Sequence, residues 1–137
     1  MAKIKLLADT DIFVDALRGV KPARNLLRRP ELDVYCSILT KKELLSKEGM
    51  KSSEKKKVEE LLSRAKILRI DEDIQKQFLF LLNKYGDKPE IRVDYIIAAT
   101  ALAKRLPLLT RNRKHFKHIA ELVLSPTYTI EPETQPA

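Results

Sequence analysis

The sequence predicts an α/β fold: a three-layer α/β/α sandwich with a mainly parallel sheet of four to five strands. Two observations predict it. Short apolar runs, typical of strands, alternate along the chain with stretches whose apolar residues recur at helical spacing. Neither an internal repeat nor a linker divides the 137 residues, a length that suits one domain. We therefore expect a single domain over residues 1–130 and a flexible, proline-bearing tail over residues 131–137.

The expected strands are short. The first stops abruptly at a pair of acidic residues, and the second is rich in β-branched and aromatic residues. Pro107 begins the last of them. The strands are expected at residues 4–8, 34–39, 67–70 and 108–110, with edge material at 123–124 and 128–130.

The expected helices follow from apolar stripes and from their start and stop signals. Gly19 and Gly86 end two of them, Pro22 suits the first turn of another, and Asp71 is a capping residue. The helix after Asp94 is apolar nearly all round, so we expect it to be buried. The helices are expected at residues 12–17, 23–29, 40–49, 58–65, 71–85, 95–105 and 112–122.

Composition narrows the possible functions. Hydrophobic residues make up 44% of the chain, so disorder is not expected, and no apolar run is long enough to span a bilayer. The N-terminus does not have the pattern of a signal peptide, and the single cysteine, Cys36, fits a reducing cytoplasm. The formal net charge of +8 favours an acidic partner such as nucleic acid over a neutral one, although a solvated lysine surface gives the same charge.

Three acidic residues fall where an expected strand meets a helix. Asp9 follows the first strand directly, Glu43 lies one helical turn beyond the second, and Asp94 begins the buried helix that leads to the fourth. Ligands of open α/β sheets bind outside the carboxyl ends of the strands. These side chains are therefore expected to meet at one edge of the sheet.

Each acid also has a purely structural interpretation. Asp9 or Asp11 could cap a helix, Asp94 could be a cap or a first-turn acid, and the Thr40–Glu43 spacing matches a capping box. Taken together, however, clustered carboxylates repel one another unless a cation or a proton lies among them. An all-oxygen site suits a hard cation, with Mg²⁺ the first expectation and Mn²⁺ a possible substitute.

Basic residues surround these acids in the sequence, and they could hold the phosphates of a nucleic acid. Ser37 and Thr110 end strands, where they could orient a carboxylate or a water. His115 and His118 have a spacing that a zinc site could use, but no third nitrogen or sulfur ligand is evident. The expected RNA-binding residues are Lys41, Lys42, Arg111, Arg113, Lys114 and Lys117.

Four segments of the chain resemble, in order, the four motifs of PIN domains. They read LADTDIF at residues 7–13, SILTKKEL at 37–44, VDYIIAATAL at 93–102 and LTRNRKHF at 109–116. The similarity is strongest to the VapC toxins of bacterial and archaeal toxin–antitoxin pairs, and it runs to about Leu124.

This resemblance implies a PIN-like fold, a cytoplasmic endoribonuclease that depends on Mg²⁺ or Mn²⁺, a homodimer, and inhibition by a cognate antitoxin. It carries the metal-binding role to Asp9, Glu43 and Asp94, and it puts Asp11 and Asn112 beside them as catalytic residues. Many PIN domains have a fourth acid in the last motif, where this chain has Asn112 and His115. That departure favours one firmly held ion over two.

Two other functions remain open at this point. A receiver-like phosphoacceptor domain also places acids at strand ends, and Asp71 follows the third expected strand. However, no lysine ends a clear fifth strand. A PIN-like module could also bind RNA without cutting it, although the three intact acids argue against that.

Overall fold

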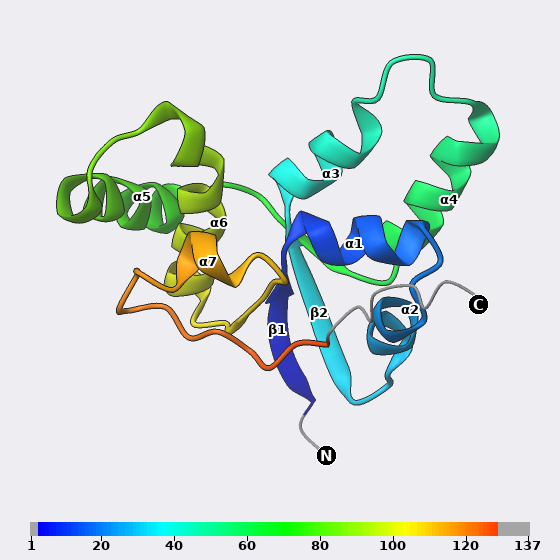
Figure 1. The fold of residues 1–137 in the computed structure, drawn as a ribbon, viewed down its shortest axis with the longest axis horizontal. Coiled ribbons are helices and arrows are strands. Elements are labelled where there is room, and N and C mark those ends of the chain that lie inside the picture. Colours follow the sequence, from blue (N-terminus) through cyan, green and yellow to red (C-terminus); the bar gives the residue numbers. More distant parts are fainter. Residues whose placement is uncertain (1–2, 129–137) are drawn as a thin grey trace, which may run out of the picture.

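A four-stranded sheet, in which every strand runs parallel, forms the centre of the computed structural model, which describes residues 3–128. The strand order is β3-β2-β1-β4, with β1 and β2 side by side at the centre (Figure 1). An isolated bridge joins Leu108 of β4 to Leu124. The α/β prediction is confirmed, with four strands among the described residues. They are β1 (Ile4–Ala8), β2 (Leu32–Ser37), β3 (Lys66–Leu68) and β4 (Leu108–Leu109).

Helices connect the strands, as parallel strands require. In chain order they are α1 (Thr10–Leu17), α2 (Lys21–Arg28), α3 (Ile38–Leu45), α4 (Ser52–Leu62), α5 (Glu72–Tyr85), the 3₁₀ helix η1 (Pro89–Ile91), α6 (Arg92–Lys104) and α7 (Arg113–Phe116).

The helices cover both faces of the sheet, so the chain has two apolar cores. Successive residues of a strand point to opposite faces. Leu6 and Ala8 of β1 therefore pack with Phe13 in a core under α1, α2 and α4, while Leu7 packs with Tyr95 in a core under α5 and α6. Burial of these side chains is the main stabilising contribution to the layered arrangement.

The topology decides which strand ends meet. β1 lies between β2 and β4, with Ala8 paired to Leu109, so the carboxyl ends of β1 and β4 are adjacent. The N–H of Asp9 donates to the Leu109 carbonyl at 2.9 Å. Residues a hundred positions apart are thereby held side by side, and the loop after β4 lies against the start of α1.

The end of β2 differs from expectation. The strand stops at Ser37, not at residue 39, because the Ser37 hydroxyl accepts a hydrogen bond from the Leu39 N–H at 3.1 Å and caps α3 there. Thr40 consequently lies inside α3, fully buried, and cannot cap it. The capping box predicted for Thr40 and Glu43 is therefore wrong.

Several other boundaries shift. α6 begins at Arg92, ahead of the expected residue 95, and β3 covers only Lys66–Leu68. α7 spans a single turn, Arg113–Phe116, and not residues 112–122, because only Phe116 and Ile119 bury apolar side chains in this charged stretch. Tyr128 is not in a strand, and residues 129–130, along with the 131–137 tail, lie outside the described part.

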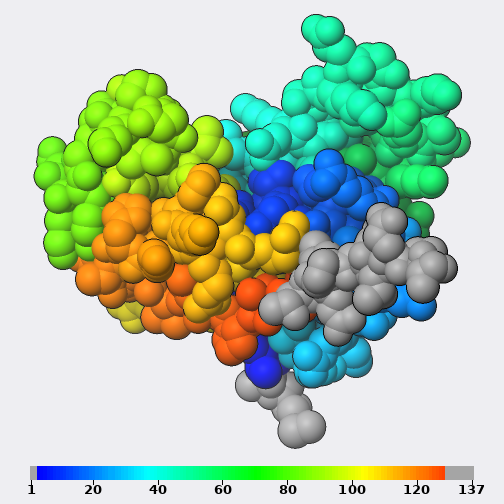
Figure 2. Space-filling model, in the orientation of Figure 1, coloured from blue at the N-terminus to red at the C-terminus, as the bar shows by residue number. Residues whose placement is uncertain are grey.

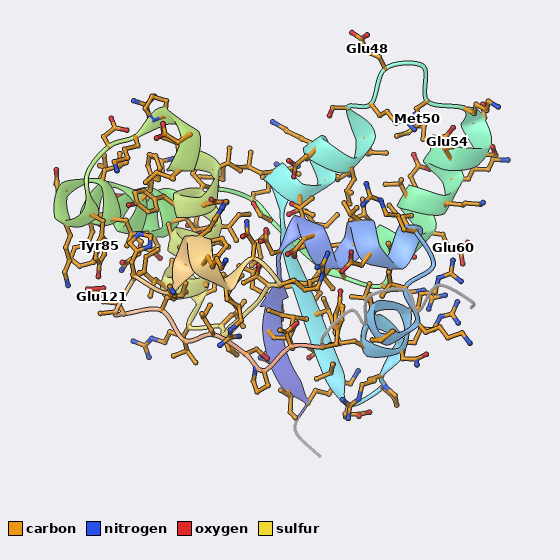
Figure 3. The ribbon with its side chains drawn as sticks, in the orientation of Figure 1. Glu48, Met50, Glu54, Glu60, Tyr85 and Glu121 are labelled. Atoms are coloured by element: carbon orange, nitrogen blue, oxygen red, sulfur yellow. The ribbon has the colours of Figure 1, made fainter. Side chains whose placement is uncertain are left out.

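A polar cluster fixes the far end of α5 to the segment after α7. The Tyr85 hydroxyl donates to Glu121 at 2.5 Å, and the Lys84 ammonium pairs with the same carboxylate (Figure 3). These two donors lower the pKa of Glu121 to about 2. Because α5 packs against α6, the cluster helps to hold the helical layer that carries Asp94.

The remaining structural expectations concern the cysteine and the membrane. Cys36 is fully buried in β2, and that burial raises the pKa of its thiol to about 12, as suits an inert core residue. No helix of the described residues has the length and apolarity that crossing a bilayer requires.

Candidate active site

An acidic pocket of about 360 Å³ opens at the carboxyl edge of the sheet. It lies in the hollow between α3 and the α5–α6 layer, over the start of α1 (Figure 2). The predicted acids come together here from three separate segments. The lining includes Asp9, Asp11, Glu43, Asp94, Arg111 and Asn112.

Asp9 both caps a helix and faces this pocket. Its Oδ1 accepts a hydrogen bond from the Thr10 N–H at 2.8 Å, and its Oδ2 accepts one from the Thr110 hydroxyl at 2.9 Å. The carboxyl is only 9% exposed. Asp9 therefore caps α1 and lines the pocket at the same time.

The surroundings of Asp9 disfavour its negative charge. Burial, and then the nearby charge of Asp11, raise its pKa to about 6, with a smaller contribution from Asp94. The hydrogen bonds from Thr110 and Thr10 act in the opposite direction and do not overcome this. A carboxylate in such a position gains stability from a cation.

Asp11 joins α1 to the loop after β4. Its Oδ2 accepts hydrogen bonds from the backbone N–H groups of Arg111 at 3.0 Å and Asn112 at 3.2 Å. Its Oδ1 is buried and has no hydrogen-bond partner among the described residues. Burial raises the pKa of Asp11 despite these donors. An unpartnered buried carboxylate oxygen is costly unless a ligand binds it.

Asp94 sits in the first turn of α6, and its side chain does not cap that helix. Its Oδ2 lies 2.9 Å from Nδ1 of His115, and the same nitrogen lies 2.8 Å from the amide of Asn112. A ring nitrogen carries at most one proton, so the two contacts compete. His115 therefore contacts Asp94 directly, whereas Asn112 contacts His115 and not Asp94.

Glu43 is exposed on α3 and reaches the pocket from the side opposite Asp94. A contact between the hydroxyls of Thr10 and Thr40, at 2.9 Å, ties the start of α1 to α3. Because Thr40 and Glu43 are three residues apart on one helix, this contact fixes where Glu43 stands relative to Asp9.

The residues present suit a hard cation, although they are not yet closed around one. The donors are all oxygens, and one buried oxygen of Asp11 lacks a partner. Within residues 3–128, no three acidic, histidine or cysteine side chains already form a set that could hold a metal. Glu43 is exposed on α3, and Oδ1 of Asp94 takes no part in the contact with His115, so both side chains keep oxygens that could bind an ion.

The histidines do not form a zinc site. His115 faces Asp94, whereas His118 packs edge-on against the Tyr85 ring and lies 3.4 Å from the Tyr95 hydroxyl. The two histidine rings thus contact different residues, and they do not point to a shared zinc ion.

The predicted RNA-binding residues lie in different surroundings. Arg111 is paired with the buried Asp15 through two hydrogen bonds, one of them 2.9 Å long, and the Tyr128 hydroxyl also donates to Asp15 at 2.6 Å. Arg113 donates to the Ser125 carbonyl at 2.9 Å. Two of the six cations therefore hold the fold together at the rim of the pocket.

The other four cations divide by location. Lys114 and Lys117 are exposed in and just after α7, beside the pocket residue Asn112. Lys42 is exposed on α3, and Lys41 lines a separate pocket with Glu59. Within the described part of the chain, Lys114 and Lys117 are therefore free of such contacts near the pocket, and the exposed Arg18, which was not among the predicted cations, lines the pocket itself.

Sequence reasoning missed Asp15 and Tyr128, and it gave Thr10 and Thr40 no role at the site. Asp15 stands one helical turn after Asp11, a spacing that could have indicated a shared face of α1. Nothing local indicates Tyr128, which is distant in sequence from the carboxylate it contacts.

Comparison with known proteins assigns the family. A family model described as PIN domain matches residues 6–122. The chain belongs to the PIN-domain family. The ribonucleases VapC19 and VapC10 of Mycobacterium tuberculosis are 36% and 31% identical to it, each over 85% of this chain and 95% and 90% of the respective relative. These similarities put this PIN domain among the VapC ribonucleases.

A solved structure gives the same fold. The complex VapBC2 of Rickettsia felis, bound to a DNA fragment from its promoter, superposes on this PIN domain with a TM-score of 0.74 and 26% identity. The match covers 89% of this chain and 98% of the other. The acidic pocket described above therefore lies in a fold shared along nearly its whole length with a toxin–antitoxin protein.

Proposed function

We propose that this VapC-family chain is an endoribonuclease that hydrolyses RNA phosphodiester bonds with the help of Mg²⁺, for which Mn²⁺ can substitute. One observation carries the proposal: Asp9, Glu43 and Asp94, from three separate segments, line a single pocket at the carboxyl edge of the sheet. The net charge of +8 of the whole chain suits a polyanionic substrate. The acids supply a place for a cation, which can neutralise the charge that builds on a phosphodiester under attack.

In this mechanism the protein's own side chains would hold the ion and orient the attacking water. Asp9, Glu43 and Asp94 provide the oxygens for the ion, and Thr110 holds Asp9 in place through its hydroxyl. Asp11 and Asn112 position the attacking water. When bound, the divalent cation makes a water more acidic and neutralises charge that builds on the phosphate. The site has no fourth carboxylate in the last motif, so we propose one firmly held ion.

His115 has a place in this scheme beside a residue that would hold the ion. It contacts Oδ2 of Asp94 at 2.9 Å, which leaves Oδ1 of the same carboxylate available for a cation. Asn112 lies 2.8 Å from the same ring nitrogen and can hold the His115 ring in place.

We also propose the partners that the family resemblance implies. The Rickettsia felis structure is a VapBC complex, and a solved Klebsiella pneumoniae relative, 31% identical, is described as a toxin–antitoxin complex. A small antitoxin and a homodimer are accordingly proposed for this chain. Light scattering of the purified protein, alone and with the product of an adjacent short reading frame, tests both.

The decisive experiment is RNA cleavage. The purified chain is incubated with total RNA in Mg²⁺, in Mn²⁺ and in EDTA, next to the variant Asp94→Asn. We expect discrete RNA fragments in the presence of either ion, and none in EDTA or with the variant. Binding of RNA without cleavage under all conditions would instead establish a binding-only module.

The receiver-like alternative has little left to support it. Asp71 accepts a hydrogen bond from the Ile74 N–H at 3.0 Å and caps α5, and it also pairs with Lys104. The sheet of the described residues has four strands, so the lysine-bearing fifth strand that a receiver needs is not found there.

A further inference from the structure

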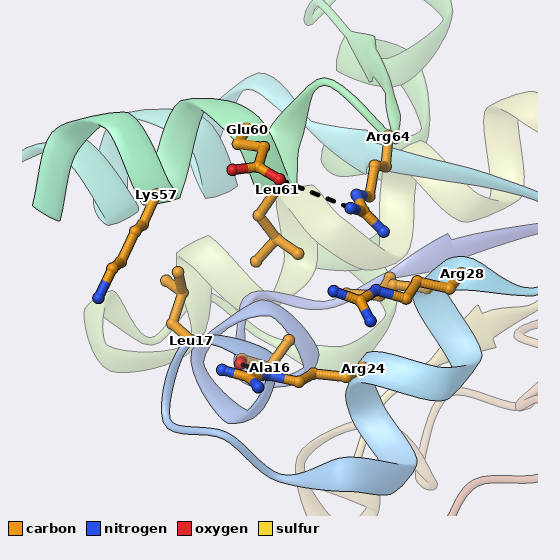
Figure 4. A pocket seen from close by; sticks show the side chains of 9 residues that line it. Ala16, Leu17, Arg24, Arg28, Lys57, Glu60, Leu61 and Arg64 are labelled. Atoms are coloured by element: carbon orange, nitrogen blue, oxygen red, sulfur yellow. Dashed lines mark hydrogen bonds and ion pairs between the residues drawn. The ribbon is translucent and has the colours of Figure 1, made fainter. Parts of the chain in front are cut away.

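A second pocket differs from the first in that its charged residues are mostly cations, four against one acid. It has a volume of about 230 Å³ and lies between α2 and α4, beside the end of α1. Arg24, Arg28, Lys57 and Arg64 line it, with Glu60 as the one acid (Figure 4). Arg24 and Arg28 project from α2, and Arg64 projects from just beyond α4, toward a common space (Figure 4).

These cations are only partly neutralised by the protein. Glu60 pairs with Arg64 at 3.6 Å, and Arg24 donates to the carbonyl of Ala16 at 3.0 Å. Among residues 3–128, no carboxylate forms an ion pair with Arg24, Arg28 or Lys57. Gathered guanidinium groups favour an anionic ligand for the same reason that gathered carboxylates favour a cation.

The floor of this pocket is apolar. It is made by Ala16 and Leu17 of α1, with Leu27 and Leu61 from the neighbouring helices. A phosphate ion has no apolar surface that could pack against such a floor. A nucleotide presents both a charged phosphate and the flat apolar face of a base, which matches a basic rim over an apolar floor.

The basic pocket is also connected to the acidic one. A third pocket, between α1, α3 and α4, shares Leu17 and Lys57 with the basic pocket and Val14 and Arg18 with the acidic pocket. The three pockets therefore follow one another along α1. The eight residues of that helix rise about 12 Å, which corresponds to roughly two nucleotides of extended backbone.

We propose that the basic pocket is a subsite for RNA, which binds the backbone phosphate and base of a nucleotide roughly two positions from the scissile bond. The proposal rests on the function proposed above, since it assumes RNA at the acidic pocket. Arg28 and Lys57 contact the phosphate, and Leu17 and Leu61 contact the base. RNA that extends along these pockets gains contacts that a shorter RNA cannot make.

The test compares two pairs of substitutions in a chain that also carries Asp94→Asn, so that RNA stays intact. The pocket pair is Arg28→Gln with Lys57→Gln. The control pair is Arg69→Gln with Lys56→Gln, which removes the same charge from exposed positions that line none of these pockets. Binding of a labelled oligoribonucleotide of about ten nucleotides, and of one of about three, is titrated at several salt concentrations.

For the longer RNA, we expect the pocket pair to weaken binding at least several-fold and to lower the log–log salt slope by about one unit per lost phosphate contact. The control pair should have a much smaller effect. The pocket pair should alter binding of the short RNA no more than the control pair does. Arg28→Lys with Lys57→Arg retains the charges and should recover most of the lost affinity, which excludes misfolding as the cause.

Equal salt slopes for the pocket and control pairs would overturn the proposal. If the pocket pair instead weakens only the binding of poly-glutamate, used as a probe for an acidic protein, the pocket serves a protein partner and the proposal is also wrong. Cleavage of the longer RNA by the parent chain in Mg²⁺ tests the nuclease separately. If the parent chain binds the longer RNA but does not cleave it, the proposed nuclease function is wrong. The binding comparison between the pocket pair and the control pair would still test the subsite.

Discussion

Asp9 shows how one side chain can serve the fold and the site at once. It caps α1 through Thr10 and receives the Thr110 hydroxyl from the far end of the chain. Its charge is nevertheless disfavoured, since burial and Asp11 raise its pKa to about 6 from an ordinary value of 3.8. Because the surroundings destabilise the charged carboxylate, a cation bound beside Asp9 would relieve that cost.

The first prediction follows from the sign of this shift. Without metal, folded Asp9 holds its proton more tightly than unfolded Asp9, so the free energy of unfolding decreases as the pH rises from about 4 to about 6. Asp9→Asn removes that cost. In EDTA at pH 8 we expect the variant to be more stable than the parent, by about 1–2 kcal/mol, and to be inactive in RNA cleavage with Mg²⁺.

Thermal unfolding in EDTA at several pH values measures this difference. It should shrink as the pH falls below about 6 and disappear below about 4, where Asp9 is protonated in both the folded and the unfolded parent. Glu48→Gln, in the exposed loop after α3, is the control for loss of one negative charge (Figure 3). A gain that is equal for both variants, or that does not depend on pH, would contradict the interpretation of Asp9.

The second prediction concerns Glu43. Because α3 begins at Ile38, the Glu43 side chain is too far along the helix to cap it. Glu43→Gln should therefore leave the melting temperature nearly unchanged and reduce Mg²⁺-dependent cleavage by at least about tenfold, since a neutral amide is a poorer ligand for a hard cation. Cleavage assays on the folded Glu43→Gln variant test this prediction. If the variant cleaves RNA as fast as the parent, Glu43 is not a metal ligand.

At the scale of elements, the start of α1 is the point on which three others converge. Its N-terminus lies between α3, joined through the hydroxyls of Thr10 and Thr40, and the loop after β4, joined through Asp11. α6 brings Asp94 from the other side of the pocket. The acidic pocket is thus set by contacts between elements, each of which involves a small polar side chain.

α7 carries the third prediction. Arg111 and Arg113 are held by Asp15 and the Ser125 carbonyl, so Lys114 and Lys117 are the two predicted cations of this segment that remain to approach RNA. Lys114→Gln with Lys117→Gln should weaken RNA binding and lower the salt slope by about one unit or less per lost phosphate contact. The melting temperature should hardly change, because exposed lysines contribute little to stability.

The measurement is an RNA titration at several salt concentrations in the Asp94→Asn background. Lys55→Gln with Lys56→Gln, on exposed positions of α4, removes the same charge away from the acidic pocket. If both double variants give the same slope, the effect is one of net charge and α7 does not contact the RNA.

At the scale of the whole molecule, the two ends of the described chain are tied together through Asp15. This carboxylate is nearly inaccessible, and it accepts from Arg111 and from the Tyr128 hydroxyl at 2.6 Å. It therefore joins α1 to the loop after β4 and to the segment that follows it. Burial and the Asp15 carboxylate raise the pKa of Tyr128, which keeps the hydroxyl protonated as a donor.

The fourth prediction tests this connection. Tyr128→Phe removes the donor from a buried acceptor and should lower the free energy of unfolding by about 1–2 kcal/mol. Urea unfolding measures the loss. Tyr35→Phe removes a hydroxyl that has no hydrogen-bond partner among the described residues, and it should change stability by less than about 0.5 kcal/mol. Equal losses would mean that the Tyr128 hydroxyl does not stabilise the fold.

Local patterns in the sequence determined the class of the fold. The period of the apolar residues depends only on the local backbone, so the α/β alternation, the Asp71 cap and the buried helix after Asp94 could be predicted from it. Element ends were less certain, as Ser37 shows. A capping hydroxyl can end a strand within an apolar run, and the run itself does not reveal where.

The candidate acids could be predicted because parallel strands place their carboxyl ends at one edge, whatever the sequences between them. Only the tertiary structure decided what surrounds those acids. The contacts of Thr110 with Asp9, of His115 with Asp94, and of Asp15 with Tyr128 span between 21 and 113 positions. Such contacts depend on strand order and on the packing of layers, which no local pattern encodes, and they give each carboxylate its charge and its partners.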